Sequence, residues 1–378
     1  MSLVLNEEQH LLKNSARDFL SANSPVEAFR ALRDKKATDE NYSDETWQQM
    51  IELGWPAITI DEAHDGLGFG YKGLGLILEE MGQRLVQSPL LSSIVLCASV
   101  IELIGTPEQK STYLPKLAAG EITMAFAFEE ALRHTGLANV QCQALAQSGK
   151  VTLSGEKKCV LNAAKADYVM VIARSSDKQL GAYVIENNAS GMSISPFRLL
   201  DGTLAHHIRF ENTAAVEHVQ DASLSADDVL TALHNTLARV RTALAAEMLG
   251  GSLGMFQVTM AYLKEREQFD VKIGSFQALK HRASQMFVQL ELAKSCVLSA
   301  LNAIDDNADD LQELACLAKA QLNDTFILVT DEATQMHGGM GVTDELDVGL
   351  FLKRARVYTQ LFGDSNHLRD EYATLKGY

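Results

Sequence analysis

The spacing of hydrophobic positions changes twice along the chain, which divides the sequence into three predicted parts. Residues 1–120 carry apolar side chains three and four positions apart, the spacing that lines one face of an α-helix. Asn6 can cap the first helix, whose apolar stripe is Leu11, Leu12, Ala16, Phe19 and Leu20. Further helices are predicted over 44–53 and 74–81, and another begins at Pro107, because the first turn tolerates proline.

In residues 121–222 the period shortens to two, which is typical of half-buried strands. The predicted strands cover 124–128, 151–153, 168–173, 182–185, 192–194 and 206–210. Several short strands joined by polar turns favour an antiparallel barrel or sandwich. Residues 223–378 return to long helical patterns without a single proline, interrupted by an acidic connection at 305–310. This third part is predicted to be a helical bundle.

Composition narrows the class of protein. The 378 residues are 47% hydrophobic, enough for a large core spread over two or three domains. A net charge of −16 disfavours nucleic acid, whose phosphates would be repelled. The sequence contains no run of about 18 apolar residues, so we expect no membrane-spanning helix. The N-terminus lacks the features of a signal peptide. The five cysteines show no metal or redox spacing, so we expect reduced thiols, no metal site and a cytoplasmic location.

One segment of the third part combines a cation, an amide and two aromatic rings. Arg266, Gln268 and Phe269 lie within four positions, and a glycine turn then leads to Phe276. The arginine fork fits a pyrophosphate, the glutamine adds neutral donors, and the phenylalanine can cover a flat ring. A helix end followed by a turn would explain any three of these residues. The whole run favours a site for a planar, anionic cofactor.

A second segment is rich in glycine. Gln335 precedes glycines at 338, 339 and 341, which weaken a helix but let the backbone approach a ligand closely. A helix cap and a tight turn would explain these glycines if they stood alone. Together with the segment at 266–286 and the glycine-rich run at 54–70, they resemble the acyl-CoA dehydrogenase family, a set of FAD flavoenzymes. The resemblance spans nearly the whole chain.

The resemblance implies a fold, a cofactor and a reaction. The fold is an α+β arrangement of an N-terminal helical domain (1–120), a middle antiparallel β-barrel or sandwich (121–222) and a C-terminal four-helix bundle (223–378). In the reaction, a carboxylate removes the α-proton of an acyl-CoA thioester and the β-hydrogen leaves as hydride to FAD; electrons usually pass to an electron-transferring flavoprotein. The residues implied to serve an FAD held by a neighbouring subunit are Arg266, Gln268, Phe269, Phe276, Gln335, Gly338 and Gly339.

The catalytic base that the resemblance implies is missing. The usual glutamate corresponds to Phe362 when the segments are compared without gaps, or to Gly363 with one insertion. The glutamate that a minority of the family carries on an earlier helix corresponds to Val240. Asp364 is a weak substitute, since a turn or helix cap is the more ordinary role for it. Glu247 lies two helical turns beyond Val240 and is interpreted as structural.

The pocket implied for this chain's own flavin also departs from the family pattern. Phe126, Phe128 and Glu129 occupy it, and Glu129 replaces a threonine that donates to the flavin ring. Thr135 keeps a hydroxyl where the family has serine and is a candidate for substrate binding. Arg241, the second such candidate, matches a family arginine near the acyl thioester. Residues for a neighbour's cofactor are therefore kept, whereas those for the chain's own chemistry are altered.

This asymmetry predicts an FAD-dependent acyl-CoA dehydrogenase that acts as one subunit of a hetero-oligomer. Its partners would be an acyl-CoA substrate of the fatty-acid or steroid side-chain type, the electron-transferring flavoprotein, and a related subunit in a homo- or hetero-tetramer, with neither nucleic acid nor membrane. One alternative is a self-sufficient homo-oligomer with an atypical base such as Asp364. Another is a homologue that has lost redox chemistry and only binds or scaffolds.

Overall fold

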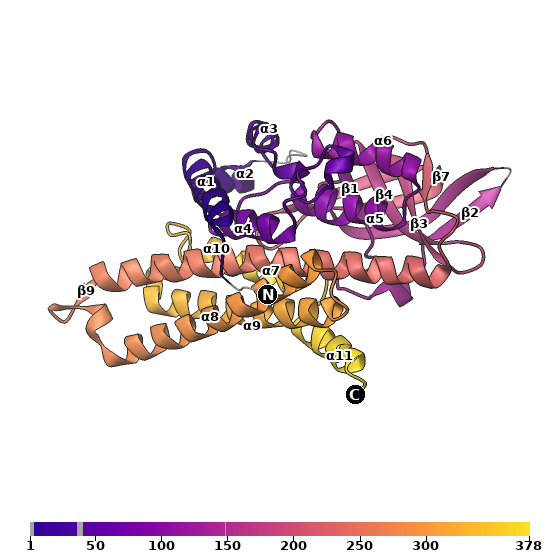
Figure 1. Ribbon diagram of the computed structural model, residues 1–378. Helices are drawn as coiled ribbons and strands as arrows, with labels where there is room; N and C mark the ends of the chain where they lie inside the picture. Colours follow the sequence, from indigo (N-terminus) through magenta and orange to yellow (C-terminus); the bar gives the residue numbers. More distant parts are fainter. Residues whose placement is uncertain (1–3, 36–40, 148) are drawn as a thin grey trace. The chain divides into compact units, whose positions relative to one another are not determined.

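The computed structural model describes residues 4–35, 41–147 and 149–378 (Figure 1). The chain forms two compact units. The first, here called the helical unit, comprises Met1–Arg33, Tyr71–Val86 and Arg241–Tyr378. The second, called the sheet unit, comprises Asp34–Gly70 and Gln87–Val240. The three domains predicted from the sequence, with boundaries at 120 and 222, stay a prediction, because the two compact units follow a different division of the chain.

Helices form where the apolar spacing predicts them in the first part of the chain. Asn6 begins α1 through a capping box: its side chain accepts from the Gln9 amide at 2.8 Å, and Gln9 accepts from the Asn6 amide at 3.0 Å. Pro107 is the first residue of its helix, as predicted. The α-helices of this part are α1 (Glu7–Asn23), α2 (Val26–Asp34), α3 (Asp44–Glu52), α4 (Tyr71–Gly82), α5 (Ser99–Ile104) and α6 (Pro107–Ala118), with a π-helix over Leu90–Ala98 and short 3₁₀ turns at Trp55–Ala57 and Glu62–His64.

The described residues of the sheet unit contain an eight-stranded sheet with the order β6-β7-β3-β2-β4-β5-β8, in which β1 pairs with β4. The path is open, so the sandwich alternative holds and a closed barrel does not form. The sheet is mixed rather than purely antiparallel, because β1 runs parallel to β4. The strands are β1 (Met124–Ala127), β2 (Gln143–Gln147), β3 (Lys150–Leu161), β4 (Tyr168–Arg174), β5 (Leu180–Glu186), β6 (Met192–Arg198), β7 (Leu204–Ala214) and β8 (Glu217–Val219).

The C-terminal part is helical, as predicted. Helix α7 (Ala226–Glu265) is followed by a hairpin of β9 (Glu267–Gln268) and β10 (Val271–Lys272) and a 3₁₀ turn at Ile273–Ser275. Helices α8 (Gln277–Asp305) and α9 (Leu311–His337) lie side by side (Figure 1). A 3₁₀ turn over Gly338–Val342, α10 (Val348–Tyr358) and α11 (Ser365–Leu375) complete the chain. The acidic residues 305–310 join α8 to α9, where Asp305 caps α4 by accepting from the amides of Tyr71 and Lys72 at 2.6 and 2.9 Å.

Glycines allow α4 and α7 to cross with their backbones in contact. A Cβ atom added at Gly82 would lie 1.9 Å from the carbonyl oxygen of Glu247, and one added at Gly250 would lie 1.9 Å from that of Glu79. Residues Glu79 and Glu80 of α4 are buried and bind Lys13 and Arg17 of α1 at 2.6 and 2.9 Å. The crossing therefore fixes three helices of the helical unit relative to one another.

Among the described residues, α8 is the one helix that is long and apolar enough, by length and composition alone, to cross a membrane. Its buried side chains recur three or four positions apart, at Met286, Leu290, Ala293, Val297 and Ala300. That spacing is typical of a bundle helix packed along one side, and α9 is its main neighbour. Packing within the helical unit accounts for this buried stripe, whereas Phe287, Val288 and Leu292 of the same helix are more than half exposed.

Candidate functional site

The first predicted cofactor segment lies in the hairpin after α7. Phe269 and Asp270 form its two-residue turn with positive φ angles of 55° and 60°, and the Phe269 side chain is 86% exposed. Phe269 contacts Phe276 edge to face, with ring centroids 6.2 Å apart. Arg266 is exposed, and its guanidinium has no hydrogen-bond or ion-pair partner within residues 4–35, 41–147 and 149–378. A strained turn thus presents an aromatic ring and a cation to solvent.

The second segment lies at the end of α9, next to the first. The ring of His337 stacks on Tyr262, with centroids 4.3 Å apart, and joins the end of α9 to the last turns of α7. Its Nδ1 donates to the carbonyl oxygen of Ala333 at 2.8 Å, and burial lowers the pKa of His337, which favours the neutral ring. The structure therefore brings together two segments that are far apart in the sequence.

The glycine turn leaves its backbone accessible. Gly338 and Gly339 are exposed, and a Cβ added at either would meet no atom within 4 Å. Gln335 is exposed beside them. Open backbone, an uncommitted arginine, exposed amides and exposed aromatic rings fit the anionic and planar parts of FAD. This group of residues, Arg266, Gln268, Phe269, Phe276, Gln335, Gly338 and Gly339, is called the exposed half-site below.

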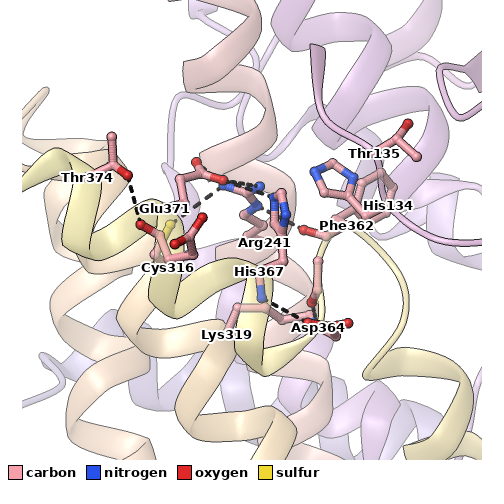
Figure 2. A network of polar contacts seen from close by, with 12 residues as sticks. His134, Thr135, Arg241, Cys316, Lys319, Phe362, Asp364, His367, Glu371 and Thr374 are labelled. Carbon is pink, nitrogen blue, oxygen red and sulfur yellow. Dashed lines mark hydrogen bonds and ion pairs between the residues drawn. The ribbon is translucent and has the colours of Figure 1, made fainter. Parts of the chain in front are cut away.

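Arg241 lies at the centre of a second, buried network in the helical unit (Figure 2). Its guanidinium binds both carboxylate oxygens of Glu371 at 2.6 and 2.8 Å. The third nitrogen, Nε, donates to the carbonyl oxygen of Phe362 at 2.9 Å. His367 approaches Glu371 at 3.3 Å from the preceding turn of α11. Arg241, which the sequence offered as a candidate for substrate binding, is thus committed to α11 and to the loop that precedes it.

The loop between α10 and α11 is held from a second side by α9. Lys319 is fully buried and donates to the carbonyl oxygen of Tyr358 at 2.9 Å and to Asn323 at 2.5 Å. Asn323 in turn donates to the carbonyl oxygen of Gly363 at 3.2 Å. Burial lowers the pKa of Lys319 well below its usual value. Sequence reasoning missed Lys319, Asn323 and Glu371, since nothing in the local pattern marks them.

The conformation of this loop distinguishes the two possible positions of the missing base. Gly363 has a φ of 121°, and a Cβ there would lie 3.0 Å from Leu368. A glutamate at 363 would therefore be strained, whereas φ at Phe362 is 57°, which other residues adopt at a modest cost. The comparison without gaps, which predicts the base position at 362 and a glycine after it, agrees with these two backbone angles. This geometry favours Phe362 as the position of the missing base.

The two acidic residues considered as substitutes for the missing base, Asp364 and Glu247, have structural partners. Asp364 is the N-cap of α11, because one of its carboxylate oxygens accepts from the amides of Asn366 and His367 at 3.0 and 2.9 Å. Glu247 is buried and accepts from the hydroxyl of Tyr358 at 2.7 Å. Val240 is fully buried and apolar. These contacts agree with the more ordinary roles weighed for Asp364 and Glu247.

The residues implied for the chain's own flavin lie in the sheet unit. Phe126 and Phe128 are buried, with ring centroids 6.3 Å apart. Glu129 is in hydrogen-bond contact with Nδ1 of His134 and accepts from the amide of Thr135 at 3.3 Å. The carboxylate offers acceptors where the family's threonine offers a hydroxyl donor. The departure of this pocket from the family pattern stays a prediction.

A buried lysine next to this region was not found from the sequence. Lys157 is fully buried, donates to the carbonyl oxygen of Phe128 at 2.8 Å and binds Glu130 at 2.7 Å. Burial lowers the pKa of Lys157, and the charge of Glu130 opposes that shift. Glu130 also accepts from the amides of Gln141 and Cys142 at 2.7 and 2.9 Å. The segment after β1 is thus fixed by charges inside the sheet unit.

The Arg241–Glu371 pair makes stability depend on pH. Burial raises the pKa of Glu371, but hydrogen bonds from His367 and Arg241 outweigh it and hold the pKa below its ordinary value of 4.5. A depressed carboxyl pKa stabilises the fold above the unfolded-state pKa, and this stability is lost as the pH falls below it. We expect the unfolding free energy to decrease between pH 5 and pH 3, and Glu371→Gln to reduce that slope by up to about 1.4 kcal/mol per pH unit. Denaturant unfolding at several pH values measures this, and equal slopes for both proteins would contradict it.

Comparison with known proteins gives consistent matches over the chain. Models described as the N-terminal and C-terminal domains of acyl-CoA dehydrogenase match residues 6–121 and 230–374. The chain is 27% identical to the probable acyl-CoA dehydrogenase YngJ of Bacillus subtilis (strain 168), over 94% of each chain. The solved structure of the "Tcur3481-Tcur3483 steroid ACAD" variant is 26% identical with a TM-score of 0.86, over 98% of each chain. The ChsE4-ChsE5 complex from Mycobacterium tuberculosis shares the fold, with a TM-score of 0.87 and 20% identity over 100% of this chain and 99% of that one.

Proposed function

Because the chain belongs to the acyl-CoA dehydrogenase family of FAD-dependent oxidoreductases, we propose that it acts as one subunit of a hetero-oligomeric acyl-CoA dehydrogenase. In this role it completes the FAD site of a related subunit, which supplies the catalytic base. FAD supplies the hydride acceptor for α,β-desaturation of the acyl-CoA thioester. One contrast carries the proposal: the exposed half-site keeps groups that could bind a cofactor, whereas Phe362, in the loop before α11, cannot act as a base.

The exposed half-site retains what a neighbour's cofactor requires. Arg266 is exposed and uncommitted among the described residues, and Gly338 and Gly339 leave room for a ligand against the backbone. An exposed phenylalanine in a left-handed conformation, Phe269, gains little for the isolated chain, because neither its backbone nor its ring is in a favourable environment. A dinucleotide bound against these residues would account for all of them together.

The groups that would perform chemistry in this chain are replaced. Phe362 cannot accept a proton, and one carboxylate oxygen of Asp364 caps α11 by accepting from two backbone amides. Glu129 brings a carboxylate to the place of a hydroxyl donor. The loop at 359–364 is nevertheless anchored by Arg241, Lys319 and Asn323. This chain keeps the loop in place but lacks a catalytic base on it. Such a chain is suited to assembly with a partner subunit that carries the base.

Two structural relatives support a two-component assembly. One is a complex of two differently named chains, and the name of the other, a steroid acyl-CoA dehydrogenase, also joins two components. We therefore propose a related acyl-CoA dehydrogenase subunit as the partner, in a tetramer, and a bulky acyl-CoA of the steroid side-chain type as a substrate class. The electron-transferring flavoprotein and the cytoplasmic location stay predictions.

The visible absorption spectrum tests the proposal, measured on this chain alone and on the complex with its sister subunit. We expect the isolated chain to hold little flavin and the complex to hold it stoichiometrically. In the complex, Arg266→Ala should weaken FAD binding by about tenfold to a hundredfold, the effect of losing a charge-assisted hydrogen bond. Lys264→Ala removes an exposed cation two residues away and is the matched control.

Two outcomes would contradict this function. A stoichiometric flavin band in the isolated chain that bleaches with an acyl-CoA would favour the self-sufficient enzyme, and Asp364→Asn would then test its base. Full FAD retention in the Arg266→Ala complex would remove the exposed half-site from the proposal. A complex that forms but takes up no flavin would favour a scaffold.

A further inference from the structure

Helix α2 is joined to the segment that follows the glycine turn by two arginines. Arg33 binds both carboxylate oxygens of Asp344 at 2.7 and 2.8 Å. Arg30 donates to the carbonyl oxygen of Asp344 at 2.7 Å and to the carboxylate of Asp347 at 2.7 Å. The two parts of the chain lie more than 300 positions apart in the sequence. We propose that α2 is a clamp that positions the Gly338–Gly341 turn for dinucleotide binding, with Arg30 and Arg33 as positioning residues.

The clamp acts where the turn lacks contacts of its own. Gly338 and Gly339 have no neighbours within reach of a Cβ, and Met340 and Val342 are 40% and 77% exposed. Gly341 alone packs closely, since a Cβ there would lie 2.6 Å from the carbonyl oxygen of Thr334. The start of the turn is fixed by the end of α9. Its exit, at 344–347, is fixed by Arg30 and Arg33.

Helix α2 is itself firmly held. Phe29 is buried, and the guanidinium of Arg354 lies over its ring at 4.7 Å. Arg354 is 1% exposed and comes from α10, the helix that begins directly after Asp347. Arg354 also lies over the ring of Tyr358 at 4.9 Å. A rigid support is what a positioning contact requires, because a mobile helix would transmit no restraint.

The contacts are polar and partly exposed, which makes them weak contributors to folding stability. Asp344 is 63% exposed on its side chain, and such ion pairs add little to the free energy of unfolding. Their bidentate geometry nevertheless fixes direction. The hydrogen bond from Arg33 holds the pKa of Asp344 at about 2, so the pair stays ionised at neutral pH. We therefore expect their removal to loosen the turn while the fold remains intact.

This inference rests on the proposed function, since the dinucleotide is the FAD of a neighbouring subunit. A turn that is already ordered binds its ligand with a smaller loss of conformational entropy. Ordering by α2 leaves the space around Gly338 and Gly339 open, because the clamp touches only the residues after the turn. The amide of Gly338 itself donates to the carbonyl oxygen of Gln335. Helix α2 would then determine how long FAD stays bound without contacting it.

The test compares Arg33→Ala, Asp344→Asn and the double variant in the complex with the sister subunit. FAD release is followed by its fluorescence, and hydrogen exchange is measured over residues 338–347. We expect each single variant to release FAD about threefold to tenfold faster and to exchange faster in this segment, with the double variant no worse than either. Arg356→Ala removes an ion pair to Asp331, at 2.8 Å, whose arginine is more exposed than Arg33, and should change neither rate. Thermal midpoints should be unchanged in all four.

Unchanged FAD release and unchanged exchange in both single variants would overturn the clamp. Hydrogen exchange is also measured on the isolated chain, where it needs no cofactor. If the wild-type complex takes up no FAD, the proposed function fails, while faster exchange in Arg33→Ala would still establish that α2 orders the turn. If the complex loads FAD, and both single variants match the wild type in FAD release and in hydrogen exchange, the clamp fails while the proposed function stands.

Discussion

Gly82→Ala and Gly250→Ala are each expected to lower the free energy of unfolding by about 3 kcal/mol or more, because a methyl group overfills a fully packed crossing. At both positions the added Cβ would lie 1.9 Å from a carbonyl oxygen of the opposite helix. A flexible side chain could turn away from such a contact, but a backbone carbonyl moves only with its helix. Helices α4 and α7 would have to separate.

Separation would also disturb the ion pairs behind the crossing. Glu79 and Glu80 are buried on α4, and their partners Lys13 and Arg17 lie on α1. A carboxylate that moves away from its cation inside the protein has a large desolvation cost. The cost of either substitution thus exceeds that of the steric contact alone.

Chemical denaturation of a graded series checks this prediction. Gly349→Ala in the first turn of α10 meets nothing within 4 Å and should be neutral or stabilising by up to about 1 kcal/mol. Gly75→Ala should be intermediate, since the atoms it meets belong to the flexible side chain of Leu301. Equal stability of Gly82→Ala and Gly349→Ala would mean that the two backbones are not in contact.

The period of apolar positions predicted most elements of this fold, because burial of one face is a local property of the sequence. The helix at 44–53 is α3, and the strand at 168–173 lies in β4. Strand β2, Gln143–Gln147, was missed because Gln-Ala-Leu-Ala-Gln contains no β-branched or aromatic residue. Its position between β3 and β4 stabilises it instead. The parallel pairing of β1 with β4 was also missed, since pairing partners are not encoded locally.

The candidate site shows the same limit. Resemblance located the two segments of the exposed half-site, and the family that they indicated is confirmed. Their contact through Tyr262 and His337, and the clamp from α2, depend on residues distant in sequence. Nothing in the local sequence marks Lys157, which is buried with Glu130 and a carbonyl oxygen as partners for its charge. Burial of a charge can be understood once its partners are known, but composition does not reveal it.

Arg241→Met is expected to lower the free energy of unfolding by about 3 kcal/mol, because it leaves the partly buried carboxylate of Glu371 without its arginine. Glu371 would lose two charge-assisted hydrogen bonds, and the carbonyl oxygen of Phe362 would lose its donor. Hydrogen exchange over residues 359–364 should rise as well, since only the contacts from α9 would still hold the loop. Arg369→Ala removes an exposed ion pair between α11 and Asp324 of α9 and should cost less than about 1 kcal/mol.

The double variant Arg241→Met/Glu371→Leu separates the two causes of that loss. If the unpaired carboxylate causes most of the cost, removing it should recover part of the stability, since an apolar pair can replace a buried ion pair. The loop should remain mobile in the double variant, because Phe362 still lacks a donor. A single variant as mild as Arg369→Ala would show that Arg241 does not hold the loop. Recovery of both stability and loop protection in the double variant would assign the anchoring to packing rather than to the hydrogen bond at Phe362.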